Sequence, residues 1–364
     1  MLSFMFSDAG TAPLNARNGV VPLRIRRVLR PIVATGYRVA TVAIQLLIVS
    51  IVVFGILRIL PADPLAMMLP PNATNEDAER MREAFGLNRS IPEQYAIWLG
   101  HTLQGDLGSS IQSRLPVGQL ILTALPMTLE LVFCGLVLGV FAGFCFGLIT
   151  FTWRGTAVEK AAEVVASLAQ SIPEFLWGIL LILTFGLALH WLPFIGPIDA
   201  KMLVPSRTGF LLIDTLLAGR WDAFFSRLTH LTLPSIAIMM IKAPLIMRLL
   251  RSSLVETYTE DYIDSARLRG VGEMRILFRH ALRNAALPTV TLIGVQAAHT
   301  FGGTLLIEAI YSLPGLGNLM IGAIRTHDLP LIQGITLTYC AVVLLLNMLV
   351  DLTYLWLNPR LRAT

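Results

Sequence analysis

Six long apolar runs dominate this sequence, and they limit the chain to one class of fold. Each run has about 20 residues, the length that a helix needs to cross roughly 30 Å of bilayer hydrocarbon. Hydrophobic residues fill 55% of the 364 positions and charged residues only 14%, so the chain is far more apolar than a soluble domain. We therefore predict an all-α integral membrane protein with six transmembrane helices. The predicted spans are Val39–Leu60, Thr128–Thr150, Val164–His190, Leu231–Leu250, Pro288–Ile310 and Ile332–Trp356.

The third run contains Pro173, which leaves two interpretations open. The run is either one kinked span or a short re-entrant piece followed by a span, because proline interrupts the hydrogen bonding of a helix. An extra span would make the count odd and would put the two chain ends on opposite sides of the membrane. The distribution of charge favours six spans.

Lys and Arg side chains indicate the orientation of the chain. Placing the N-terminus in the cytoplasm puts 17 of them inside and nine outside, and the outside ones lie in longer segments. The predicted topology is therefore N-in and C-in. The net charge of +5 reflects this excess of arginine on the inside, so we infer no nucleic-acid partner from it.

Small residues recur every four positions in two of the predicted spans. Gly135, Gly139, Gly143 and Gly147 share one helix face, and Gly294, Ala298 and Gly302 form a similar ridge in the fifth span. A neighbouring helix can approach closely at such a face. We expect these ridges to pack the bundle; a sliding surface used during gating is the alternative.

Two charged residues, Glu174 and Lys242, fall near the middle of their spans. A charge inside the membrane is costly, so such side chains usually face the bundle interior, a partner or a water-filled path. Either the two residues pair with each other or they line a pathway. Arg58, Glu308 and Asp351 lie closer to span ends, where we expect them to reach the polar interface.

The sequence offers little for enzyme or metal chemistry. Cys134, Cys145 and Cys340 all lie inside apolar runs, where we expect them to act as small packing residues, so no metal site is predicted. A phosphate-binding loop of the Gly-x-x-x-x-Gly-Lys-Ser/Thr type does not occur. We therefore predict neither catalytic residues nor ATPase activity for this chain.

One hydrophilic stretch stands out, with nine charged residues between Glu260 and Pro288. Thr257 and Glu260 have the spacing of a capping box that would open a first helix, and Gly270 is a natural stop for it. A second helix follows, with arginines on one stripe and apolar residues on another. The apolar residues are Met274, Leu277, Phe278, Ala281, Leu282 and Ala285. The pattern predicts a helix-turn-helix held against the membrane domain.

An amphipathic hairpin lying on lipid headgroups is an alternative for this stretch. Such a hairpin accounts for the arginines, but it leaves Asp261, Asp264, Glu273 and the glycine between the helices without a role. A docking element for a soluble cytoplasmic partner accounts for all of them. We therefore favour docking.

The same stretch resembles a known motif. Asp264-Ser265-Ala266, Gly270 and Leu287-Pro288 are similar to the EAA motif of permease subunits in bacterial binding-protein-dependent ABC importers, with Asp in place of Glu and Ser in place of the first Ala. Further segments resemble the dipeptide, oligopeptide and nickel branch of that family. They are Leu60–Pro64, Arg82–Leu87, Gly105–Ser110, Ser171–Pro173, Ile307–Glu308, Leu313–Gly317 and Asn358–Arg360.

The resemblance implies a type I ABC importer permease fold with cytoplasmic coupling helices, in the bacterial inner membrane. A cytoplasmic segment 1–38, a membrane domain 39–357 and a cytoplasmic tail 358–364 would follow one another. The membrane domain would include a periplasmic segment 61–127 and a coupling loop 251–287. The residues that the resemblance implies for ATPase coupling are Asp264, Ser265, Ala266, Arg267, Gly270 and Glu273.

The resemblance also implies the partners. They are a second, similar permease subunit, two ABC ATPase subunits and a periplasmic substrate-binding protein, with ATP and Mg²⁺ held by the ATPases and no cofactor on this chain. Dipeptides, oligopeptides, nickel chelates and opine-like compounds all remain open as the transported solute. An ion-driven secondary transporter and a non-transporting receptor are the rival classes, and Glu174 with Lys242 is the feature that favours the former.

Overall fold

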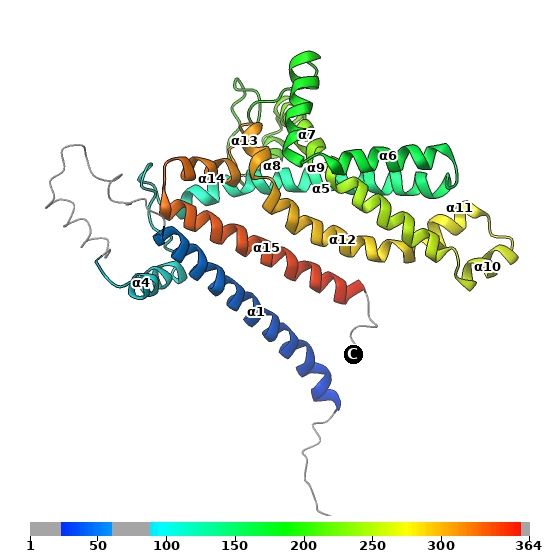
Figure 1. Ribbon diagram of the computed structural model, residues 1–364, viewed down its shortest axis with the longest axis horizontal. Helices are drawn as coiled ribbons and strands as arrows, with labels where there is room; N and C mark the ends of the chain where they lie inside the picture. The colour runs from blue at the N-terminus through cyan, green and yellow to red at the C-terminus, as the bar shows by residue number, and fades with distance from the viewer. Residues whose placement is uncertain (1–22, 60–87, 358–364) are drawn as a thin grey trace, which may run out of the picture. The chain divides into compact units, whose positions relative to one another are not determined.

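The computed structural model describes residues 23–59 and 88–357, and this part of the chain is mostly helical, without a β-strand (Figure 1). The chain divides into two units, Met1–Gln45 and Leu46–Thr364. The first contributes the beginning of α1, and the second holds every other described element. The α-helices are α1 Leu23–Ile59, α4 Ile91–Leu103, α5 Val117–Thr152, α6 Ala157–Ser171, α7 Glu174–Leu181, α8 Leu211–Leu217, α9 Trp221–Thr257, α10 Asp261–Leu268, α11 Glu273–Arg275, α12 Leu282–Gly303, α13 Leu305–Ile310, α14 Leu316–Arg325 and α15 Leu329–Leu357. Two π-helical segments are η1 Ile182–Ala188 and η2 Ile276–Ala281.

Four helices of the described part are long and apolar enough to cross a membrane, and a fifth span exists if the bent pair formed by α6 and α7–η1 is counted as one. The predicted all-α membrane fold is therefore confirmed, with four or five candidate spans in place of the six expected. The missing run, Pro288–Ile310, is divided between α12 and α13. The four spans are Val39–Arg58, Val117–Thr152, Trp221–Thr257 and Leu329–Val350.

The break in the third run lies where Pro173 predicted it. The segments Ala157–Ser171 and Glu174–Ala188 meet at 101°, and Ile172 between them is extended, with φ −102° and ψ 127°. Proline pushes the preceding residue out of the helical region, which explains why α6 ends there. A broken span and a re-entrant loop both fit this bend.

The glycine ridge of α5 packs directly against α9. A Cβ atom on Gly143 would lie 2.6 Å from Cβ of Ile246, and one on Gly135 would lie 2.7 Å from Cδ1 of Ile238. Gly139 and Gly147 face Lys242 and Leu250 in the same way. Because both sets repeat every four residues, the two helices fit together along their length, and the predicted packing role of this ridge is confirmed.

The ridge predicted in the fifth span is only partly correct. Gly294 packs closely on α15, where a Cβ would lie 2.5 Å from the side chain of Val350, and Ala298 is buried. Gly302 has no other atom within 4 Å of its Cβ position. The close contact therefore ends before the last turn of α12.

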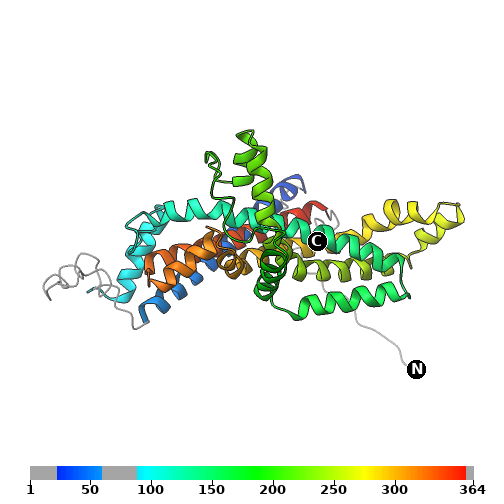
Figure 2. The ribbon, with the colours of Figure 1, turned by 90° about the horizontal axis from the view of Figure 1, so that it is seen from above.

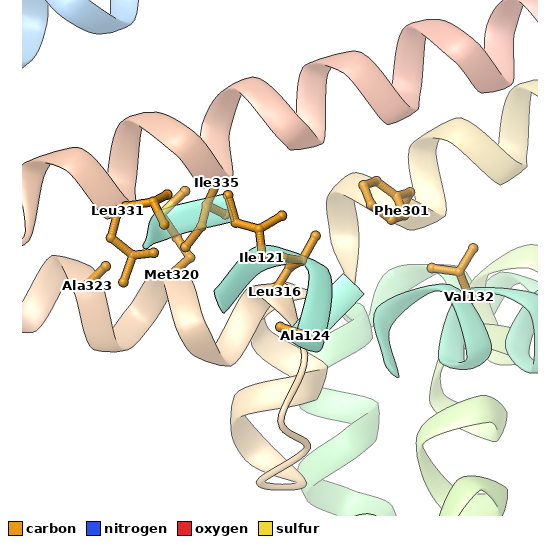
Figure 3. Packing of buried hydrophobic residues seen from close by; sticks show 10 residues of the cluster. Ile121, Ala124, Val132, Phe301, Leu316, Met320, Ala323, Leu331 and Ile335 are labelled. Carbon is orange, nitrogen blue, oxygen red and sulfur yellow. The ribbon is translucent and has the colours of Figure 1, made fainter. Parts of the chain in front are cut away.

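Figure 3 shows a buried cluster that joins α5, α12, α14 and α15. Leu316 and Met320 of α14 pack on Ile121 of α5, and Leu331 and Ile335 of α15 close the cluster. A second cluster lies at the other end of α5, around Phe151 and Leu250. In both overall views α14 and α10 lie at opposite ends of the α5–α9 pair (Figures 1 and 2).

Several sequence predictions concern residues outside the described ranges. They include the N-terminal residues 1–22, the motifs Leu60–Pro64 and Arg82–Leu87, and the C-terminal Asn358–Arg360.

Candidate functional site

The charged loop, residues 251–287, begins later than its sequence pattern suggested. Thr257 belongs to the last turn of α9, and its hydroxyl donates to the carbonyl oxygen of Ser253 at 2.7 Å. Glu260 takes the N-cap position of α10 without a side-chain capping bond. The predicted capping box is therefore wrong, because a threonine hydroxyl within a helix readily bonds to its own preceding turn.

The predicted stop at Gly270 is present. Gly270 has φ +76°, the left-handed region that favours glycine. The N–H of Val271 donates to the carbonyl oxygen of Ala266 at 3.1 Å, and the N–H of Gly270 donates to that of Arg267 at 2.8 Å. These two bonds form a Schellman motif, which ends α10 and reverses the chain.

The second helix of the charged loop packs by most of the predicted face, because Leu277, Ala281 and Ala285 are buried and Leu282 packs against the same cluster, but not by all of it. Met274 and Phe278 are 66% and 53% exposed, whereas Ile276, Leu277 and Ala281 are buried. The predicted face was derived from α-helical spacing. Ile276–Ala281 is π-helical instead, and its i to i+5 hydrogen bonds bring Ile276 and Ala281 onto one face. The buried face belongs to the cluster that also contains Phe151, Leu250 and Ile263.

Three of the predicted coupling residues form an exposed ionic group. The Nε of Arg267 donates to Oε1 of Glu273 at 2.7 Å, and its Nη1 donates to Oδ1 of Asp264 at 3.2 Å. Hydrogen bonding from Arg267 lowers the pKa of Glu273 below its usual range. Because all three side chains are open to solvent, the group fixes the shape of the turn more than it stabilises the protein.

Of the remaining predicted coupling residues, Ser265 is exposed and Ala266 is buried in the cluster beneath the loop. Ala266 therefore anchors α10 and does not offer its side chain to a partner. Leu268, the last residue of α10, was missed: its side chain is 90% exposed. A single leucine at a helix end belongs to no pattern that would indicate its exposure from the sequence.

Glu174 and Lys242 lie close enough for an electrostatic interaction, on α7 and α9. They form no ion pair within 4.0 Å in the part of the chain that the structure describes, and Oε1 of Glu174 is buried without a hydrogen-bond partner there. Lys242 is buried, and its Cβ lies 3.0 Å from the Cβ position of Gly139, so the missing side chain of that glycine makes room for it. The structure brings the two charges into one region without direct contact.

A buried ion pair between Glu130 and Arg227 was not predicted. Oε2 of Glu130 accepts from Nε and Nη2 of Arg227 at 3.0 and 2.7 Å, and both side chains are excluded from solvent. Oε1 of Glu130 accepts from the N–H of Leu212, and Nη1 of Arg227 donates to the carbonyl oxygen of Pro197. This network ties α5 and α9 to α8 and the loop before it.

Glu308 does not reach the interface as predicted, because it is completely buried. Its Oε2 accepts from the N–H of Gly317 at 2.7 Å, in the first turn of α14. A Cβ on Gly315 would clash with the same oxygen, which explains why the chain has glycine beside this carboxylate. The Leu313–Gly317 segment thus wraps around Glu308 at the start of α14, where a carboxylate is favourable.

The Gly105–Ser110 segment is held by a second buried carboxylate. The hydroxyl of Ser110 donates to Oδ2 of Asp328 at 2.5 Å, and the N–H of Gln112 donates to the same oxygen at 3.3 Å. Asp328 immediately precedes α15. This contact fixes the chain before α5 against the start of α15.

Within the described residues, four or five apolar spans, buried charges between them and an exposed helix-turn-helix at one end define a multi-pass helical membrane protein. A family profile described as the binding-protein-dependent transport system inner membrane component matches residues 135–363, and the profile of its N-terminal part matches residues 29–132. The chain belongs to this family.

Three curated relatives align with most of the chain. A di/tripeptide transport system permease protein, DppB, of Pseudomonas aeruginosa is 35% identical over 86% of this chain and 94% of the relative. A putative peptide permease protein of Brucella suis is 37% identical over 88% and 96%, and the dipeptide transport system permease protein DppB of Escherichia coli K12 is 34% identical over 86% and 94%. A solved structure of the inward-facing MetNI methionine ABC transporter shares 16% identity over 66% of this chain and 97% of that one, with a TM-score of 0.49.

The family places the chain in the inner membrane as a multi-pass component of a transport system that depends on a binding protein. It is a transport subunit and not an enzyme.

Proposed function

We propose that this chain is one of two paired permease subunits of an ABC importer that carries short peptides from the periplasm into the cytoplasm. Relatives named for dipeptides, di/tripeptides and peptides support peptides over nickel chelates and opine-like compounds. Two ATPase subunits would drive the cycle with ATP and Mg²⁺ on their own sites, and this chain would hold no cofactor.

The observation that carries the proposal is the charged loop. Asp264, Arg267 and Glu273 shape a rigid turn, and Leu268 presents an apolar side chain beside it. An exposed leucine within a charged rim has the composition of a small docking surface for a protein partner. ATP-driven movement of an ATPase would reach the spans through α10, because Ile263 and Ala266 are anchored in the cluster with Phe151 and Leu250.

The proposed topology is N-in and C-in. The end of α5 at Phe151 and the charged loop share one buried cluster, which agrees with the placement of both on the cytoplasmic side. Single cysteines at Asn88, Arg267 and Thr364, in a background without the three native cysteines, test it with an impermeant thiol reagent on intact cells. Labelling at position 88 alone is expected, and labelling at position 267 would overturn the orientation.

We further propose that Glu174 and Lys242 line the passage. Their separation beyond ion-pair distance, within the part of the chain that the structure describes, favours this role over a purely structural pair. A charged group that faces a water-filled path needs no direct partner.

Reconstitution tests the proposed function directly. Proteoliposomes that contain both permeases, the ATPases and the binding protein should take up a radiolabelled dipeptide such as Ala-Ala when ATP is enclosed with the ATPases. An ion gradient without ATP should give no uptake. Uptake driven by the gradient alone would identify a secondary transporter and would refute the proposal.

A further inference from the structure

A groove of about 560 Å³ lies between α5 and α14, away from the charged loop. Its walls come from three segments: the turn at residues 110–115, the first two turns of α5, and residues 314–323. The volume lies within the range of roughly 300–1,000 Å³ that is usual for small-ligand sites. Neither the buried ion pair nor Glu174 and Lys242 belongs to its lining.

The lining of the groove is uncharged, and most of its surface is apolar, with a few polar side chains among the apolar ones. Gln112, Gln119 and Asn318 contribute three carboxamides, and none of the lining residues, all of them within the described part of the chain, is Asp, Glu, Lys, Arg or His. The three carboxamide groups form no hydrogen bond to other described residues. Each therefore remains able to donate and to accept.

The floor of the groove is rigid. Ala124, Ala323 and Leu331 line the groove and also belong to the buried cluster of α5, α14 and α15 (Figure 3). The wall at Gly315 is held from behind by Glu308, whose Oε2 accepts from the N–H of Gly317 at 2.7 Å and lies against the Cβ position of Gly315. Polar groups held on a packed scaffold of this kind can bind a ligand with little loss of conformational freedom.

From these observations we infer that the groove is a binding subsite for the backbone of the transported peptide. A peptide bond offers one donor and one acceptor, and a carboxamide satisfies both. Uncharged walls contact the backbone that all peptides share and leave charged side chains and termini to the open, solvated side. The inference rests on the proposed function and adds the place where the chain holds its substrate.

The position of the groove agrees with this role. In the proposed topology the start of α5 and the helix α14 lie on the periplasmic side, where a binding protein would release its peptide. The charged loop lies at the other end of the α5–α9 pair (Figures 1 and 2). A peptide in the groove would therefore meet the permease before it passes between the spans.

Gly322 allows the groove to be blocked without disturbing the fold. It lines the groove in the middle of α14, and its Cβ position has no other atom within 4 Å. Gly322→Leu would place a side chain in the space that the peptide is inferred to occupy. Gly100→Leu is the matched control, because Gly100 also lies in a helix, with no atom within 4 Å of its Cβ position, and is not part of the groove.

The experiment measures uptake of radiolabelled Ala-Ala and Ala-Ala-Ala, and ATP hydrolysis stimulated by loaded binding protein, in proteoliposomes of the full complex. Gly322→Leu should lower uptake at least about tenfold while stimulated hydrolysis stays within about twofold of wild type. Asn318→Leu should lower uptake about fivefold, since a neutral hydrogen bond contributes about that much. Gln104→Leu, an exposed carboxamide outside the groove, should match wild type.

Each outcome of this experiment either supports or refutes the peptide subsite. Unchanged uptake in Gly322→Leu, or equal losses of uptake and hydrolysis, would mean that the groove holds lipid or solvent or serves assembly, and the inference would be wrong. A wild-type complex that takes up neither peptide would instead refute the proposed function, and the subsite would be rejected with it.

Discussion

Replacement of Gly143 by alanine tests whether the contact between α5 and α9 depends on the absence of a side chain. The new methyl carbon would lie 2.6 Å from Cβ of Ile246 and 2.9 Å from the carbonyl oxygen of Ala243. Carbon atoms in favourable contact are about 3.5–4.0 Å apart, so the helices must separate by about 1 Å. Neither neighbour can rotate away, because one is a backbone atom and the other a branched Cβ.

Overpacking of this kind costs about 1–3 kcal/mol, and alanine returns about 0.5–1 kcal/mol through its higher helix propensity. The net loss in the free energy of unfolding should therefore be about 0–2.5 kcal/mol. The control is Gly302→Ala, at a helical glycine with open space at its Cβ position, which should gain stability.

The free energies of unfolding of both variants and the wild type can be measured by titration with a denaturing detergent in mixed micelles, followed by tryptophan fluorescence. Equal stability of Gly143→Ala and Gly302→Ala would refute the close packing of α5 on α9.

Three further substitutions test separate parts of the account. Gly270→Val should leave the subunit folded and inserted, because α10 and η2 keep their buried anchors, but should abolish the ATP hydrolysis that loaded binding protein stimulates. Full stimulation would contradict the proposal that the turn at Gly270 couples the ATPase to the spans. If both residues line the passage, Lys242→Met and Glu174→Gln should each lower peptide uptake, and the two losses should add in the double variant. Uptake by the double variant above that of Lys242→Met alone would show a structural pair instead. Arg227→Met should lower the free energy of unfolding in detergent by about 3–5 kcal/mol, because it leaves the buried carboxylate of Glu130 without its partner, and Glu130→Gln in the same chain should restore part of that loss. A loss under about 1 kcal/mol would show that the pair is not buried in the membrane-embedded protein.

Features that depend on local spacing were predictable from the sequence. Glycines at every fourth position can only form a bare helix face, and the structure confirms this face at Gly135 and Gly143. Gly270 between two helical patterns predicted a left-handed turn, and its φ of +76° agrees. The proline after Ile172 predicted the break between α6 and α7 for an equally local reason.

Features that depend on distant contacts were not predictable. Arg227 lies just before the apolar run that was counted as a span, and nothing near it in sequence indicates its pairing with Glu130. Glu308 looked like a residue at a span end, but the following glycines wrap around its carboxylate. The π-helical segment Ile276–Ala281 changes which side chains are buried, and the apolar stripe that includes Met274 and Phe278 gave no sign of it.

Docking of an ATPase subunit on the charged loop can be measured at Leu268. Leu268→Asp places a charge where the proposed surface is apolar, and Leu203→Asp is the matched control because Leu203 is 86% exposed, comparable to the 90% of Leu268, in the loop before α8. Both variants are purified in detergent through a tag on the permease, and the bound ATPase subunits are quantified against wild type. The account predicts that Leu268→Asp loses most of the bound ATPase while Leu203→Asp retains it. Equal retention by the two variants would contradict the account.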